Sequence, residues 1–257
     1  MPTLDSSGVP IHYIDEGSGP AIVLVHGFAS SIAGNWRAPG IIDALLGAGR
    51  RVVALDCRGH GESGKPHEPD AYNGTQMADD VIALMDHVGL DVADLMGYSM
   101  GGALSAALLV RRPERFRSVV LAGIGDAIVN GGLLNPARTG ALAEAMEAKP
   151  GETHRDATAA GFRIFAERTG NDLGALGAMQ RSRRAGFDAT KLADVSIPVM
   201  VLLGEGDTLV GSADKLAAAI PGAKLVKVPG DHLTAVVQPA LKAAVLAFLA
   251  TASPAAA

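Results

Sequence analysis

Residues 95–102 read Leu95-Met96-Gly97-Tyr98-Ser99-Met100-Gly101-Gly102. The centre of this stretch has the pattern Gly-x-Ser-x-Gly, which is typical of a sharp turn between a β-strand and an α-helix. The glycines let the backbone make the turn and approach neighbouring elements without a colliding Cβ. Because such a turn lifts the middle hydroxyl clear of the backbone, Ser99 is the first candidate nucleophile.

The residues on either side of this turn fit a strand and a helix in the required order. Residues 93–98 are an apolar run of strand length. Residues 100–112 are rich in Ala and Leu and end before Pro113, which cannot continue a helix. We therefore predict a strand, a tight turn at Ser99 and a helix.

Apolar runs and helical patterns alternate along much of the chain. Runs without polar interruption are typical of strands buried on both faces of a parallel sheet. Such a run occurs at 21–25. Further strands are predicted at 51–55, 117–122, 198–203 and 224–228, while 9–14 alternates like an antiparallel strand. Helices are predicted at 36–48, 76–88, 212–220 and 234–250. This order predicts an α/β fold, with a mostly parallel central sheet flanked by helices.

The alternation stops between residues 127 and 193. This segment contains no convincing strand, only Ala-rich helical pieces broken by residues such as Gly131, Gly132 and Pro150. It predicts a small helical cap inserted into a core of residues 1–126 and 194–257. A basic cluster in it, Arg181, Arg183 and Arg184, is best interpreted as a solvated face, with a site for a substrate carboxylate as the alternative.

A nucleophilic serine needs a base within hydrogen-bond reach and an acid that orients the base. Ser99, Asp207 and His232 each follow a predicted parallel strand, so they should converge on one edge of the sheet. We expect Ser99 to be the nucleophile, His232 the base and Asp207 the acid. Asp126 is an alternative acid, and Asp231 is expected to be structural because sequence neighbours rarely face each other.

Attack on a carbonyl also needs backbone N–H groups that stabilise the developing oxyanion. Met100 directly follows the nucleophile, and Phe28 lies in the loop after the strand at 21–25, so their amides are the expected pair. In the same loop, His26 is expected to brace the backbone through hydrogen bonds. The histidines without a catalytic context are expected at the surface: His60, His67, His87 and His154.

With these landmarks the chain resembles the α/β-hydrolase superfamily over practically its full length. The matching motifs, in order, are His26-Gly27-Phe28, the loop 56–63, residues 97–102, residues 204–207 and residues 230–232. The resemblance implies a hydrolase without a cofactor and with the roles given above. Serine at the elbow argues against the epoxide hydrolases and haloalkane dehalogenases of that superfamily, which use a carboxylate nucleophile.

Composition excludes several other classes of protein. The chain has 257 residues, of which 48% are hydrophobic and 19% charged, as in a well-packed globular enzyme. The net charge of −5 provides no broad basic field for nucleic acid or an anionic membrane. Cys57 is the single cysteine, which excludes an internal disulfide and a cysteine zinc cluster and fits the cytoplasm. The residues after Met1 lack the basic and apolar regions of a signal peptide, and we expect no membrane segment.

The predicted reaction is hydrolysis of a small-molecule carboxylic ester through an acyl-enzyme, that is, a serine carboxylesterase. Hydrolysis of a carbon–carbon bond in a ring-cleavage dienoate is an alternative, suggested by Asn35 and Trp36 near the oxyanion loop and by the arginine cluster. Cofactor-free perhydrolysis is another. Outside the enzymes, a ligand receptor that keeps the fold is the remaining alternative, and it would not react with a fluorophosphonate probe.

Overall fold

The computed structural model describes residues 1–257 apart from 131–135, 150, 153 and 254–257. The described residues form an eight-stranded sheet in the order β1-β2-β4-β3-β5-β6-β7-β8. β2 pairs antiparallel with β1 and β4, and all other neighbours are parallel, so the predicted mostly parallel sheet is confirmed. The strands are β1 (Thr3–Ser6), β2 (Val9–Glu16), β3 (Ala21–Val25), β4 (Arg51–Leu55), β5 (Ala93–Tyr98), β6 (Phe116–Ala122), β7 (Val199–Gly204) and β8 (Lys224–Val228).

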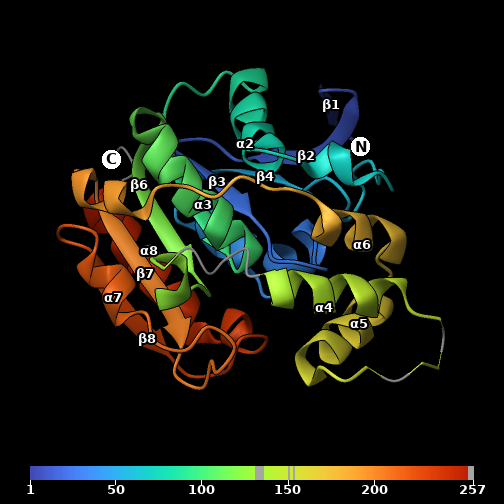
Figure 1. Ribbon diagram of the computed structural model, residues 1–257. Helices are drawn as coiled ribbons and strands as arrows, with labels where there is room; N and C mark the ends of the chain where they lie inside the picture. Colours follow the sequence, from blue (N-terminus) through green and yellow to red (C-terminus); the bar gives the residue numbers. More distant parts are fainter. Residues whose placement is uncertain (131–135, 150, 153, 254–257) are drawn as a thin grey trace.

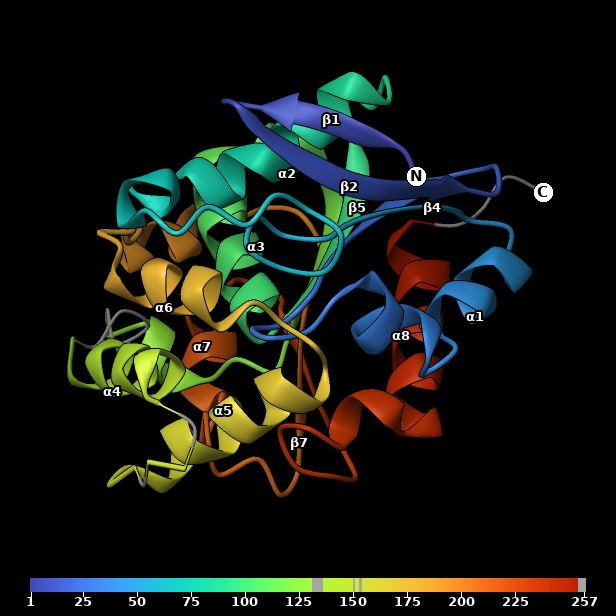
Figure 2. The same ribbon diagram turned by 90° about the vertical axis from the view of Figure 1, so that its right-hand side faces the viewer.

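Helices cover both faces of this sheet, as the apolar strands require. In β3, Val23 and Val25 belong to the core layer under α2 (Gln76–His87) and α3 (Met100–Arg111). Ile22 and Leu24 belong to the layer under α1 (Ile41–Gly47) and α8 (Pro239–Ala252). Figure 2 shows α1 and α8 together on one side of the sheet and α2 and α3 on the other. Because helices cover both faces of β3, none of its side chains faces solvent, which explains its uninterrupted apolar sequence.

Among the described residues, three α-helices lie between β6 and β7, which are neighbours in the sheet although far apart in sequence. They are α4 (Pro136–Glu147), α5 (Ala157–Arg168) and α6 (Leu173–Arg181), and they form the group coloured from green to gold in Figure 1. The strand pattern resumes at β7, and the short α7 (Asp214–Ala218) precedes β8. The predicted breaks at Gly131, Gly132 and Pro150 lie outside the described residues, and the division into core and cap stays a prediction.

Some predicted elements differ from the observed ones. The helix expected at 36–48 is wrong: a π-helical turn, Ala33–Arg37, is separated from α1 by Gly40, whose φ of 72° interrupts the helix. The helix expected at 234–250 is also divided, because Pro239 has no N–H and instead begins α8. β1 at the sheet edge was not predicted. Within the described residues, no helix has the length and apolar character needed to cross a membrane.

Candidate active site

Ser99 lies at the turn between β5 and α3, in a backbone conformation that side chains rarely adopt. Its φ is 54° and its ψ is −111°, and its N–H donates a 2.8 Å hydrogen bond to the carbonyl of Ala122. A Cβ on Gly101 would collide with the Val25 carbonyl, and one on Gly102 would lie 2.7 Å from the Ala122 oxygen. The surrounding strands therefore fix the strained turn, and the glycines are needed for the close approach.

The structure brings Ser99, His232 and Asp207 together in one hydrogen-bonded chain. The Nε2 atom of His232 lies 2.8 Å from the Ser99 Oγ, and its Nδ1 atom lies 2.7 Å from the Asp207 Oδ2. An ionised carboxylate only accepts hydrogen bonds, so this contact places the imidazole proton on Nδ1. The Nε2 lone pair then faces the serine hydroxyl, as proton removal from that hydroxyl requires.

The loops that carry Asp207 and His232 are held to each other by their backbones. The Glu205 N–H donates to the Val228 carbonyl at 2.8 Å, and the Gly206 N–H donates to the Gly230 carbonyl at 2.9 Å. Gly230 has a φ of 108°, and a Cβ there would lie 2.8 Å from the Ala235 nitrogen. The parallel pair β7 and β8 thus delivers the carboxylate and the imidazole to the same point.

Tyr98 supports the imidazole from the side of β5. Its hydroxyl donates a 2.7 Å hydrogen bond to the carbonyl of His232, and the two rings are 5.9 Å apart. Burial raises the pKa of the Tyr98 hydroxyl above its usual range. The residue beside the candidate nucleophile therefore stays neutral and positions the His232 backbone.

The other carboxylates considered from the sequence have different partners. Asp126 accepts a 3.0 Å hydrogen bond from the Leu216 N–H, which ties β6 to α7. Asp231 accepts hydrogen bonds from the hydroxyl and N–H of Thr234, at 2.6 and 2.9 Å. Both therefore serve the local backbone, whereas Asp207 contacts the imidazole.

The loop after β3 passes directly over Ser99. A Cβ on Gly27 would lie 3.4 Å from the Ser99 Cβ, and the Gly27 N–H donates to the Asn35 Oδ1 at 2.9 Å. The amides of Phe28 and Met100 donate to no acceptor among the described residues. Their role as the donors to an oxyanion stays a prediction.

His26 braces this loop and does not contact Ser99. Its Nδ1 lies 2.8 Å from the Gly27 carbonyl, and its Nε2 accepts a 2.9 Å hydrogen bond from the Cys57 N–H, so the proton is on Nδ1. The ring is completely buried, and burial lowers its pKa. His26 is therefore neutral and joins the loops after β3 and β4.

The expectation of a surface position is wrong for His60, which is completely buried. The glycine-rich turn after β4 folds inward, and the His60 ring packs edge-on against His26 and Phe28 at centroid distances of 5.2 and 5.9 Å. Burial lowers the pKa of His60 to about 3. The residue packs behind the loop after β3, a position that its glycine-rich surroundings did not indicate. His67 and His87 are exposed, as expected.

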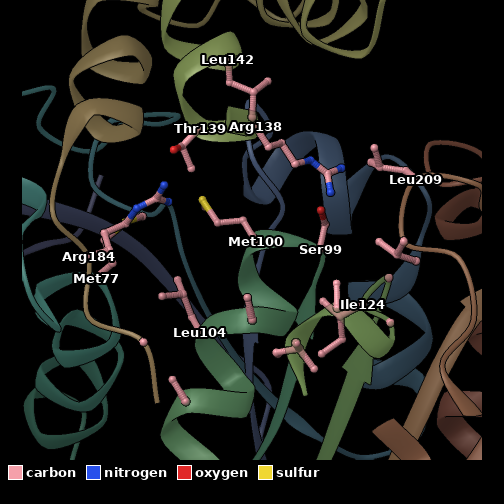
Figure 3. A pocket seen from close by; sticks show the side chains of 18 of the residues that line it. Met77, Ser99, Met100, Leu104, Ile124, Arg138, Thr139, Leu142, Arg184 and Leu209 are labelled. Atoms are coloured by element: carbon pink, nitrogen blue, oxygen red, sulfur yellow. The ribbon is translucent and has the colours of Figure 1, made fainter. Parts of the chain in front are cut away.

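A cavity of about 230 Å³ opens above Ser99 and His232. Its walls are mostly apolar and come from α3, the loop after β6, α4, α5 and the segment after α6 (Figure 3). Met100 and Leu104 line it from α3, Ile124 from the loop after β6, and Phe162 from α5. Such a cavity suits a small, largely apolar molecule with its reacting bond at the serine hydroxyl.

The predicted basic cluster is divided by the fold. Arg181 pairs with Glu147 at 2.7 Å, and Arg183 is exposed. Arg184 instead lines the cavity, and so does Arg138 of α4, which the sequence analysis did not identify. A regular Ala-rich helix gives no sign of which way a single arginine points, so no sequence signal marked Arg138. Within the described residues, no group of three or more His, Cys, Asp or Glu side chains is arranged to hold a metal ion.

Residues 20–239 match the profile of the alpha/beta hydrolase fold family. The chain therefore belongs to this family.

Relatives within the family act on different bonds. The chain is 39% identical to the bifunctional epoxide hydrolase 2 of Sus scrofa over 112 residues, 44% of this chain and 20% of that protein. It is 33% identical to the 2-hydroxymuconate semialdehyde hydrolase of a Pseudomonas strain over 46% of this chain and 41% of that protein. These matched segments thus span less than half of either relative. The structure of the enol-lactonase from Burkholderia xenovorans covers 96% of this chain and 99% of its own, with 27% identity and a TM-score of 0.73.

Proposed function

We propose that this protein is a serine carboxylesterase that hydrolyses small-molecule esters through an acyl-enzyme. The observation that carries the proposal is the hydrogen-bonded chain from Ser99 through His232 to Asp207 at the floor of an apolar cavity. The likeness to an enol-lactonase supports it, since a lactone is a cyclic ester. No cofactor takes part in the proposed reaction. Residues 127–193 would serve as the cap that shapes the substrate cavity over a core of 1–126 and 194–257.

In the first half of the reaction, the Ser99 Oγ attacks the ester carbonyl carbon while its proton moves to the His232 Nε2. The Asp207 carboxylate stabilises the resulting imidazolium through the 2.7 Å contact at Nδ1. The carbonyl oxygen becomes an oxyanion, and the free amides of Phe28 and Met100 donate to it. The intermediate collapses when the C–O bond to the alcohol breaks and the imidazolium returns its proton to the departing alkoxide oxygen.

In the second half, water takes the place of the alcohol. His232 removes a proton from the water, the new hydroxide attacks the acyl carbon, and the same amides hold the second oxyanion. The acid leaves when the bond to the Ser99 Oγ breaks and that oxygen recovers the proton from His232. The side chains thus return to their starting state.

The decisive test compares the wild type with Ser99→Ala on p-nitrophenyl esters of increasing acyl length. Removing a triad serine lowers kcat by about 10⁶-fold, so the variant should show essentially no turnover above background. A fluorophosphonate probe should label Ser99 in the wild type and leave the variant unlabelled. A wild type that is as inactive as the variant across the panel would refute the proposal, and absence of labelling would favour a receptor.

The epoxide hydrolase relatives suggest another bond, but the residue at the elbow argues against it. As noted above, those enzymes attack with a carboxylate, whereas the position here is Ser99. Turnover of styrene oxide by the wild type, lost in Ser99→Ala, would overturn this assignment.

Carbon–carbon bond hydrolysis of a ring-cleavage dienoate is the second candidate, because two observations favour it. One relative is named a 2-hydroxymuconate semialdehyde hydrolase, and the buried Asn35 Nδ2 beside the oxyanion loop has no hydrogen-bond partner among the described residues. Such dienoates are yellow, so loss of colour on incubation with enzyme is a direct assay. Unchanged colour together with rapid ester hydrolysis would dismiss this candidate.

A further inference from the structure

The cavity above Ser99 has an unbalanced charge. Two arginines line it, Arg138 from α4 and Arg184 from the segment after α6, and no described lining residue is acidic. Figure 3 shows the Arg184 guanidinium on one side and the Arg138 guanidinium close above Ser99, with Met100 between the two arginines. The whole chain carries a net charge of −5, so this local excess of positive charge is opposite in sign to the molecule.

Arg184 differs from the deeply buried arginines of this protein. Arg50 pairs with Asp94 at 2.8 Å and Arg58 with Asp80 at 2.6 Å. Arg184 has no carboxylate within ion-pair distance in the described part of the chain; its Nη2 donates only to the neutral Gln180 Oε1, at 3.1 Å, and its buried Nε has no partner. The side chain as a whole is partly exposed, but its Nε–H has lost water without gaining an acceptor, so a bound anion would offset a desolvation that is already present.

The guanidinium is charged and its backbone is fixed before any ligand arrives. Burial lowers the pKa of Arg184 to about 10, which leaves the group protonated at neutral pH. The residues on both sides bond to the loop before α2: the Gly74 N–H donates to the Arg183 carbonyl at 2.9 Å, and the Ala185 N–H donates to the Gly74 carbonyl at 2.7 Å. A planar donor held in this way is suited to two parallel hydrogen bonds from a carboxylate.

We propose that the ester substrate carries a carboxylate at the far end of its acyl chain, and that Arg184 binds this carboxylate while the ester carbonyl lies at Ser99. The inference rests on the proposed esterase function. The acyl group stays bonded to Ser99 after the alcohol has left, so the cavity wall along α3 holds the acyl chain. Met100 and Leu104 provide the apolar surface between the serine and the guanidinium.

Arg138 has a weaker part in this arrangement. It is exposed, and it also borders a second cavity that contains Asp156, whose Oδ1 caps α5 through the Ala159 N–H at 2.8 Å. A solvated arginine attracts an anion only modestly because water and salt screen its charge. Arg138 therefore adds positive potential near the serine, and Arg184 supplies the directional contact.

The test uses two substrates of similar length, mono-p-nitrophenyl adipate and p-nitrophenyl heptanoate, which differ in the terminal carboxylate. Loss of hydrogen bonds to a charged group corresponds to about 10- to 100-fold in affinity, so Arg184→Gln should raise KM for the adipate ester by roughly that factor. Its kcat/KM for the heptanoate ester, which offers Arg184 no carboxylate, should fall by a much smaller factor. Arg183→Gln, one residue away and outside the cavity, is the matched control and should leave both substrates unchanged.

A binding measurement gives a readout independent of turnover. Free adipate should inhibit heptanoate ester hydrolysis competitively in the wild type, and Arg184→Gln should weaken this inhibition by about the same 10- to 100-fold. Arg184→Lys keeps a positive charge but lacks the planar guanidinium. Inhibition of this variant by adipate should be intermediate between that of the wild type and that of Arg184→Gln.

The possible outcomes separate the two proposals. If neither ester is hydrolysed in a Ser99-dependent way, the esterase proposal fails. If the heptanoate ester is hydrolysed well and the adipate ester is not preferred, or if Arg184→Gln lowers both activities equally, the esterase stands and the carboxylate site is refuted. An Arg184→Gln variant that unfolds is assessed through Arg184→Lys, for which unchanged inhibition by adipate together with no adipate preference in the wild type overturns the site.

Discussion

The carboxyl ends of the strands around Ser99 and the glycines of α4 and α5 tolerate added side-chain atoms very differently. Beside Ser99, a single methyl group added to Gly101 would collide with the backbone of β3. In α4 and α5, added methyls on Gly140 and Gly161 would meet no atom within 4 Å. In the first region, tightly packed backbone leaves no room for a larger residue. In the second region, side chains around the cavity can be substituted without a backbone collision. Under the proposed function, the tightly packed region would carry the chemistry and the open region would select the substrate.

The largest expected effect is on kcat, and it comes from replacing Asp207, the hydrogen-bond partner of His232. Asp207→Asn should lower kcat by about 10⁴-fold, because an amide favours the wrong imidazole tautomer and does not stabilise the imidazolium. Asp126→Asn is the matched control, since an amide oxygen still accepts from the Leu216 N–H. Steady-state kinetics on one p-nitrophenyl ester compares the two, and a larger loss in Asp126→Asn would assign the acid to Asp126.

The contrast in tolerance can be measured with one kind of substitution at two glycines. Gly101→Ala should lower the free energy of unfolding by about 2–4 kcal/mol, because β3 or the elbow must move to admit the methyl group. Gly161→Ala should raise it by about 0.5–1 kcal/mol, because alanine loses less entropy than glycine in a helix and the site has room. Urea denaturation followed by circular dichroism measures both. Equal changes in the free energy of unfolding for the two variants would contradict the proposed difference in packing between the two regions.

A dependence of stability on pH is expected from the buried loop behind Phe28. The pKa of His60 is about 3 in the folded chain, below its ordinary value of 6.5, so the unfolded chain binds one more proton between these values. His60 therefore makes stability fall as the pH drops from 6.5 toward 3, by up to about 1.4 kcal/mol per pH unit. His60→Gln should show a shallower acid slope in urea titrations at several pH values. An unchanged slope would mean that His60 does not contribute.

The convergence of the three candidate catalytic residues could be predicted, because the order of the strands along the chain determines where their ends lie. The carboxyl ends of parallel strands meet at one edge, so Ser99, Asp207 and His232 had to approach one another once their strands were recognised. The hydrogen bonds now seen between them were not needed for that argument. The roles of Phe28 and Met100 remain predictions of the same kind.

The positions that escaped prediction depend on contacts distant in sequence. Gly40 is the exception, because Pro39 and Gly40 are a local turn signal that already marks the break before α1. His60 lies among glycines, which usually mark an exposed turn, yet its loop packs against Phe28. Arg184 enters the cavity because its backbone pairs with Gly74, and no local pattern distinguishes it from Arg183.

One contact between the two regions limits how they can be recombined. The Ala29 carbonyl, in the oxyanion loop, accepts hydrogen bonds from the Thr169 hydroxyl at 3.1 Å and the Asn171 side-chain amide at 2.8 Å, both between α5 and α6. A chimaera that receives residues 127–193 from a relative would import a new cavity wall and discard these two donors. The helices over this cavity are therefore not a portable module: a graft that changes the substrate keeps the oxyanion loop in place only if it carries equivalents of Thr169 and Asn171.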